Sequence, residues 1–175
     1  KNNETLQLVL VLKAVEDFKK GLFSQSSEVF ERAIKIKEDK LLEAYSLYWL
    51  GRSEYERNRF DNALDVFKRF QKHPNKTNIE SNIRLPYDMA YIYFKLGEYP
   101  YALKFFKEFN AANDSFNASY QRDTFLRMGD CEFALKQYWP AMEFYNTAIA
   151  LNPQRGAYAT FQKGMSYGFV DRNPK

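Results

Sequence analysis

Hydrophobic and small residues recur along this chain at a fixed spacing. A small residue stands at positions 14, 51, 90 and 129, so that successive copies lie 37, 39 and 39 residues apart. After each small residue an aromatic residue follows at nine positions, a small residue at twelve, an aromatic residue at sixteen and an apolar residue or alanine at nineteen. Self-similarity at such a period is the signature of a repeat protein. The copies read Ala14-Phe23-Ser26-Phe30-Ala33, Gly51-Phe60-Ala63-Phe67-Phe70, Ala90-Tyr99-Ala102-Phe106-Phe109 and Gly129-Tyr138-Ala141-Tyr145-Ala148.

The spacing predicts two helices joined by a tight turn in each copy. Between positions 44 and 58 large apolar residues recur three and four positions apart, which is the period of an α-helix. The small residue marks where the first helix presses on the second, because a larger side chain would push the axes beyond the roughly 8–10 Å of close packing. Asn58 and Gly97 stand where the first helix should end in a left-handed residue. Asp61 and Pro100 suit the start of the second helix, as cap and first-turn residue.

This pattern resembles the tetratricopeptide repeat, a family that alternates an A helix and a B helix in units of about 34 residues. The best-matching stretch is FLRMGDCEFALKQYWPAMEFYNTAIALNP, residues 125–153. The resemblance implies an all-α fold, a right-handed α/α superhelix (solenoid) of about four helix pairs plus a C-terminal helix. The chain is then a single repeat domain, and its predicted units are residues 7–40, 44–77, 83–116, 122–155 and a partial unit at 157–175.

Some positions depart from the family pattern. Pro86 stands where a large apolar residue is expected, which predicts an A helix that begins late. Glu132 replaces a large hydrophobe, with Phe133 beside it as a substitute. The last segment reads as an A helix with Gly164 in the small position and no B helix after it. Because that helix is rich in apolar residues, whereas a terminal cap has a polar outer face, we expect this chain to be a fragment that continues beyond Lys175.

Composition narrows the class of protein. Hydrophobic residues make up 45% of the chain, which permits a core and excludes a disordered polymer. The net charge of +4 comes from interspersed charges of both signs, so no basic stripe for nucleic acid is expected. The single cysteine, Cys131, cannot form an internal disulfide and is expected to be a buried small hydrophobe. No stretch reaches the roughly 18 apolar residues of a membrane span, and the run from Leu6 to Leu12 is expected to be a buried helix.

The resemblance implies a function in protein–protein contact. In that family the A helices line a concave groove that commonly binds an extended peptide or a partner's helix. The partner's identity and the oligomeric state are left open, and for each tyrosine the alternative is packing between A helices. The predicted groove residues are Tyr45, Tyr48, Arg52, Tyr55, Arg84, Tyr87, Tyr91, Phe94, Asp123, Leu126, Arg127 and Asp130.

Candidate chemistry is sparse, and we expect no enzyme, cofactor or metal site. His73 is the one histidine, and it stands beside Pro74 without a visible orienting partner. No nucleophile elbow, phosphate loop or metal-ligand cluster occurs in the sequence. An RNA-binding helical repeat fits the anchor positions less well.

One resemblance in the sequence indicates a cellular location. The 39-residue units and the phrase YIYFKLGEYPYALKFFKEF resemble repeat proteins of the bacterial envelope. These include outer-membrane assembly lipoproteins and periplasmic partners of cell-division complexes. The alternative function is therefore a structural or assembly component of an envelope complex, in the periplasm or at the outer membrane.

Overall fold

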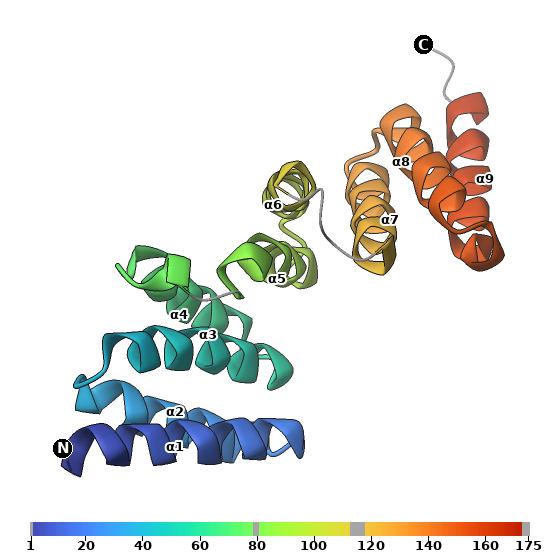
Figure 1. The fold of residues 1–175 in the computed structure, drawn as a ribbon. Coiled ribbons are helices and arrows are strands. Elements are labelled where there is room, and N and C mark those ends of the chain that lie inside the picture. Colours follow the sequence, from blue (N-terminus) through green and yellow to red (C-terminus); the bar gives the residue numbers. More distant parts are fainter. Residues whose placement is uncertain (1, 79–80, 113–117, 173–175) are drawn as a thin grey trace. The chain divides into compact units, whose positions relative to one another are not determined.

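The computed structural model describes residues 2–78, 81–112 and 118–172, which form helices and connecting turns without any strand (Figure 1). The all-α prediction is therefore confirmed over the described residues. The α-helices are α1 (Asn2–Lys19), α2 (Phe23–Ile36), α3 (Lys40–Glu56), α4 (Phe60–Lys72), α5 (Ser81–Lys95), α6 (Tyr99–Ala111), α7 (Ala118–Ala134), α8 (Tyr138–Leu151) and α9 (Ala157–Arg172). Short 3₁₀ turns follow α4 at Lys76–Asn78 and α8 at Pro153–Arg155.

The chain divides into two compact units, and the division falls within α5. The N-terminal unit comprises residues 1–88 and the C-terminal unit comprises residues 89–175. Helices α1, α3, α5 and α7 are the predicted A helices, and α2, α4, α6 and α8 are the B helices. Each B helix begins at the aromatic residue nine positions after the small residue, which is Phe23, Phe60, Tyr99 or Tyr138.

The turn between the helices of each pair uses one backbone device. The residue seven positions after the small residue has a positive φ in every copy: +75° at Gly21, +58° at Asn58, +77° at Gly97 and +62° at Lys136. At Gly97 the N–H donates to the carbonyl of Phe94 at 3.1 Å, and the N–H of Glu98 donates to the carbonyl of Tyr93 at 2.9 Å. This is the Schellman ending of a helix. The predictions for Asn58 and Gly97 are confirmed, and Gly21 and Lys136 complete the series.

The small residues seat aromatic rings, as their positions predict. A Cβ added at Gly51 would lie 2.5 Å from Cε1 of Phe67, and one at Gly129 would lie 2.5 Å from Cε1 of Tyr145. Neither position can hold a side chain unless the ring moves. All of the residues twelve, sixteen and nineteen positions after the small residues are buried. At Gly164 on α9, by contrast, nothing lies within 4 Å of an added Cβ.

Three local expectations are wrong. Pro86 lies inside α5, which begins at Ser81, because only about one turn precedes the proline and few helical hydrogen bonds are lost there. Asp61 lies in the first turn of α4, and the N-cap position before Phe60 is Arg59, without a side-chain cap.

The third concerns the run from Leu6 to Leu12, which is helical but only partly buried. Leu10 and Val11 are buried, whereas Leu6, Leu8, Val9 and Leu12 are exposed. Gln7 takes a buried place because its amide donates to the carbonyl of Asp39 at 3.1 Å and accepts the Asp39 N–H at 2.8 Å.

Pro153 follows the end of α8 at Leu151 and begins the 3₁₀ turn. Within the described residues, no helix combines the length and the apolar character that a membrane crossing requires.

Candidate functional site

The predicted groove residues lie on α3, α5 and α7, and the boundary between the units divides them into two sets. We call the residues up to 88 the N-terminal set and those from 89 the C-terminal set, and each is described within its own unit. The N-terminal set is Tyr45, Tyr48, Arg52, Tyr55, Arg84 and Tyr87. The C-terminal set is Tyr91, Phe94, Asp123, Leu126, Arg127 and Asp130.

Asp88 is the centre of the N-terminal set. The hydroxyl of Tyr48 on α3 donates to Oδ2 of Asp88 on α5 at 2.6 Å. Oδ1 lies 3.4 Å from Nη2 of Arg84 and 3.7 Å from Nη1 of Arg52. Burial and the Asp88 carboxylate raise the pKa of Tyr48 above its ordinary value. The sequence prediction missed Asp88, although its place four residues after Arg84 on a helix is the spacing of an ion pair.

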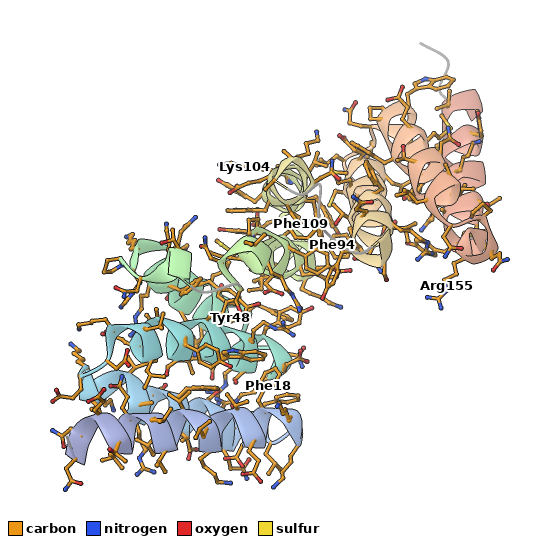
Figure 2. The ribbon with its side chains drawn as sticks, viewed as in Figure 1. Phe18, Tyr48, Phe94, Lys104, Phe109 and Arg155 are labelled. Carbon is orange, nitrogen blue, oxygen red and sulfur yellow. The ribbon has the colours of Figure 1, made fainter. Side chains whose placement is uncertain are left out.

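Tyr48 belongs to the core rather than to an accessible surface (Figure 2). Its side chain is 2% exposed and packs on the rings of Phe67 and Phe70 of α4, at centroid distances of 5.8 and 5.6 Å. The ring of Tyr48 thus packs on a B helix, whereas the alternative stated for the tyrosines was packing between A helices. Arg52 is partly buried, and its guanidinium carbon lies 5.9 Å from the ring centroid of Phe18. The remaining tyrosines, Tyr45, Tyr55 and Tyr87, are each partly exposed.

Arg127 organises the C-terminal set. Its Nε donates to the hydroxyl of Tyr91 at 3.1 Å, and its Nη1 donates to Oδ2 of Asp130 at 2.8 Å. The Tyr91 hydroxyl in turn donates to Oδ2 of Asp123. The guanidinium carbon lies 5.9 and 5.8 Å from the ring centroids of Tyr91 and Phe94, a cation–π distance. Burial, followed by the Asp123 carboxylate, raises the pKa of Tyr91 to about 12.

Asp130 links this set to two further helices of the same unit. Its Oδ1 accepts hydrogen bonds from the hydroxyls of Tyr145 on α8 at 3.0 Å and Tyr158 on α9 at 2.9 Å. Neither tyrosine was predicted at the site. Burial, followed by Asp130, raises the pKa of Tyr145 above its ordinary value. Leu126 is 5% exposed and belongs to the core cluster with Ala141, Tyr145, Ala148 and Ala159.

The two sets therefore share one chemical design. Partly exposed arginines and aromatic rings stand above buried hydrogen-bonded groups that fix their positions. Charge-assisted hydrogen bonds of this kind hold side chains in one geometry more firmly than neutral ones. The arrangement suits contact with another molecule over an area, since Tyr and Arg present large surfaces with polar tips.

The residues with reactive side chains are held in structural roles. Cys131 is buried, and burial followed by the charges of Asp130 and Glu132 raises its pKa to about 12, so the thiol is protonated at neutral pH. Nε2 of His73 lies 3.7 Å from Oε2 of Glu43. Across the ranges that the structure describes, no group of His, Cys, Asp and Glu side chains is arranged to hold a metal ion.

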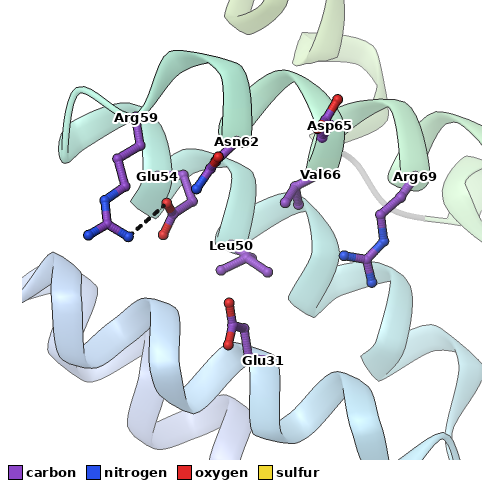
Figure 3. Close-up of a pocket in the computed structure, with 8 residues that line it drawn as sticks. All are labelled: Glu31, Leu50, Glu54, Arg59, Asn62, Asp65, Val66 and Arg69. Carbon is purple, nitrogen blue, oxygen red and sulfur yellow. Dashed lines mark ion pairs between the residues drawn. The ribbon is translucent and has the colours of Figure 1, made fainter.

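A polar cavity of about 190 Å³ lies between α2, α3 and α4 of the N-terminal unit (Figure 3). Both carboxylates and guanidinium groups line it, above an apolar floor. It lies apart from the predicted groove residues, and no sequence pattern predicted it. The lining residues are Glu31, Leu50, Glu54, Arg59, Asn62, Asp65, Val66 and Arg69.

Comparison with known proteins identifies the repeat. Residues 45–76 and residues 123–155 each match the tetratricopeptide repeat family. A stretch of 73 residues is 33% identical to the outer membrane protein assembly factor BamD of Buchnera aphidicola subsp. Acyrthosiphon pisum (strain APS). That stretch is 42% of this chain and spans only 29% of the BamD sequence.

Two solved structures illustrate the fold. The crystal structure of MamA superposes with a TM-score of 0.76 at 16% identity, covering 93% of this chain and 81% of MamA. YrrB, described as a TPR protein with an unusual peptide-binding site, gives a TM-score of 0.73 at 14% identity, covering 94% of this chain and 78% of YrrB. At such low identity these likenesses show the fold alone.

Proposed function

We propose that this chain, a tetratricopeptide repeat protein, is a non-enzymatic scaffold that binds a peptide or a segment of a partner protein through the predicted groove residues of its A helices. Proteins of this repeat class mediate protein–protein interactions and are typically non-enzymatic. The observation that carries the proposal is the design of the two sets. Their arginines and aromatic rings are partly exposed and held in place by buried partners.

The partly exposed members are the ones that we expect to contact the partner. In the N-terminal set these are Tyr45, Arg52, Tyr55, Arg84 and Tyr87, and in the C-terminal set Tyr91, Phe94, Asp123 and Arg127. Tyr48, Leu126 and Asp130 support them from beneath. Side chains that are already immobilised lose less conformational entropy on binding, roughly 0.5–1.5 kcal/mol for each one, so a fixed surface binds more tightly than a mobile one.

Site-specific photo-crosslinking tests this proposal. A photoreactive phenylalanine analogue replaces Tyr45, Tyr87 or Phe94, and the matched controls place it at Lys68 or Glu108, which are exposed on the B helices α4 and α6. We expect partner proteins to be crosslinked from the A-helix positions and not from the controls. Crosslinks confined to Lys68 and Glu108, with the A-helix positions silent, would overturn the assignment.

A second candidate function is assembly of a bacterial envelope complex. The observation that favours it is the 33% identity with BamD over 73 residues. Fractionation of cells that express the gene in full tests this candidate. Recovery with the outer membrane or periplasm supports an envelope role, whereas recovery in the cytoplasm rejects it without affecting the crosslinking experiment.

A further inference from the structure

An acidic residue lies three positions after the small residue in several copies of the repeat. These residues are Asp17, Glu54 and Glu132, and they are only 2%, 4% and 9% exposed. A buried carboxylate is costly unless a cation or hydrogen-bond donor accompanies it. Asp17 has Nζ of Lys13 at 2.6 Å from Oδ1, and Glu132 has Nζ of Lys107 at 3.8 Å from Oε1. In both places the chain supplies an ammonium group.

Glu54 lacks such an ammonium group. Its Oε1 accepts hydrogen bonds from Oγ of Ser27 and Nη1 of Arg57, each at 2.6 Å. Its Oε2 is buried but accepts no hydrogen bond from the parts of the chain that the structure describes. Nη1 of Arg59 lies 3.9 Å away on an exposed side chain, an ion pair about as long as that of Lys107 with Glu132, and it gives this oxygen no hydrogen bond. A buried acceptor without a donor costs about 1–3 kcal/mol, so this oxygen favours an incoming donor.

The repeat register explains the difference between Glu54 and Glu132. Lys107, the partner of Glu132, stands 17 residues after the small residue Ala90. The residue 17 positions after Ala14 is Glu31, so the corresponding position before Glu54 carries the opposite charge.

The residues around these positions differ in size as well. Nζ of Lys107 lies 5.8 Å from the ring centroid of Phe144, and the register equivalent of Phe144 is the smaller Val66. Because Glu31 and Val66 stand where the C-terminal unit has Lys107 and Phe144, the space beside Glu54 is an open cavity of about 190 Å³ (Figure 3).

We propose that this cavity binds the ammonium group of a lysine side chain from a partner protein, in the place that Lys107 takes beside Glu132 in the C-terminal unit. Glu31, Glu54 and Asp65 supply the negative charge. Leu50 and Val66 form an apolar surface for the methylene groups, which lysine buries when its charged end meets polar groups. The cavity is smaller than the roughly 300–1,000 Å³ that holds a drug-sized ligand, so it fits one side chain rather than a cofactor.

The arginines that line the cavity refine the partner's chemistry. Arg59 and Arg69 lie among the lining residues and carry positive charge that repels a densely basic segment. Carboxylates on either side of the partner's lysine pair with the guanidinium groups of Arg59 and Arg69. The partner segment therefore has a lysine flanked by acidic residues. This site is separate from the A-helix sets and does not depend on them.

An NMR titration of the protein with short peptides tests the proposal. The probe is acetyl-Glu-Lys-Glu-amide, and its control carries acetyl-lysine, which has no charge. We expect the lysine peptide to shift the amide resonances of Leu50 and Val66 in a saturable way, and the acetylated peptide to bind at least about tenfold more weakly, a difference of 1.4 kcal/mol or more. Equal binding of both peptides would overturn the proposal.

A third probe, n-butylamine, separates a lysine side chain from a small free amine. We expect the lysine peptide to bind more tightly than n-butylamine, because only the peptide carries carboxylates for Arg59 and Arg69. Butylamine binding as tightly as the peptide, or more tightly, would overturn a protein partner as the occupant.

Two substitutions in the cavity and one control substitution outside it complete the test. Glu31→Lys places the chain's own ammonium beside Glu54, so it should abolish peptide binding and raise the melting temperature. Glu54→Gln should weaken binding at least tenfold. Glu28→Lys makes the same charge change at an exposed position of α2 outside the cavity and should leave binding within about twofold. Unchanged binding by Glu31→Lys, or equal loss in Glu28→Lys, would contradict the site. Crosslinking at Tyr45, Tyr87 and Phe94 should be unaffected throughout.

Discussion

The repeat built on Gly51 and the repeat built on Gly129 share their packing but not their polar contacts. Both glycines lie against an aromatic ring sixteen positions later, Phe67 in α4 and Tyr145 in α8, with the same 2.5 Å approach to an added Cβ. The residue after the glycine is Arg52 in one repeat and Asp130 in the other. Accordingly Tyr145 donates its hydroxyl to Asp130, whereas Phe67 has no hydroxyl to donate.

The difference between these repeats separates the register positions that make the fold from those that can recognise a partner. Apolar and small positions of the register are nearly interchangeable, because their task is to bring an A helix and a B helix to close packing. Polar positions of the same register vary in sign, as Arg52 against Asp130 and Glu31 against Lys107 show. The constant positions make the fold, and the variable positions are where a partner can be distinguished.

Filling the glycine positions should have the largest effect. We expect Gly51→Leu and Gly129→Leu each to lower the free energy of unfolding by roughly 1–3 kcal/mol or more, because the new side chain must displace a buried ring. Urea unfolding followed by circular dichroism measures the change.

Gly164→Leu is the matched control for these substitutions. Nothing lies within 4 Å of an added Cβ at Gly164, so the leucine should leave stability unchanged or slightly higher, as its helix propensity exceeds that of glycine. Equal destabilisation by Gly164→Leu would contradict displacement of the Phe67 and Tyr145 rings as the cause of the loss.

Making the two rings identical should have a moderate effect. Tyr145→Phe removes the hydrogen bond to Asp130 and should cost about 0.5–1.5 kcal/mol in unfolding free energy, because Asp130 keeps Arg127 and Tyr158 as donors. Tyr101→Phe, at an exposed ring on α6, should change nothing measurable. If both substitutions leave the urea midpoint where it was, the buried hydroxyl makes no contribution and the contrast with Phe67 loses its meaning.

A substitution in the turn after an A helix should have a smaller effect on stability, and Lys136→Gly should raise stability rather than lower it. Lys136 holds a left-handed φ of +62° at the end of α7, where α5 uses Gly97. Lys136→Gly should raise stability by about 0.5 kcal/mol, since relief of left-handed strain slightly exceeds the entropy that glycine loses on folding. Gly97→Lys should lower it by a similar amount. Differential scanning calorimetry of both variants checks the signs, and a drop in melting temperature for Lys136→Gly would refute the assignment.

The smallest effect concerns the residue two positions after each glycine, Ser53 in one repeat and Cys131 in the other. Burial raises the pKa of Cys131 to about 12, so very little of the reactive thiolate is present at pH 8. The folded protein should therefore resist iodoacetamide at pH 8, while the urea-unfolded protein is labelled within minutes. Mass spectrometry of the two samples measures this, and rapid labelling of the folded chain would show that the helix pair opens readily.

The parts of the structure that could be predicted depend on local spacing. The starts of the B helices and the left-handed residues at 58 and 97 follow from period and residue type within one unit. The contact of Asp88 with Tyr48 and that of Tyr158 with Asp130 were missed because they join residues 40 and 28 positions apart, through side-chain directions that spacing does not specify. The burial of Tyr48 was not predicted for the same reason. An aromatic residue at helical spacing gives the same sequence pattern whether its ring packs on a B helix or faces the solvent.

The occupant proposed for the cavity at Glu54 could be inferred only by comparing repeats within the folded chain. Its signal in the sequence is the charge reversal between Glu31 and Lys107. That signal has meaning only once the partner of each buried carboxylate is known.

The most direct test of the central claim exchanges those two charges in one protein. The claim is that two register positions, held by Glu31 and Val66 in one unit and by Lys107 and Phe144 in the other, decide whether the buried carboxylate of the A helix is open to an external lysine. In the triple variant Glu31→Lys/Lys107→Glu/Phe144→Val, we expect that acetyl-Glu-Lys-Glu-amide no longer shifts Leu50 and Val66 and instead shifts the amide resonance of Met128. Shifts that stay at Leu50 and Val66, or that fail to arise at Met128, would contradict the claim.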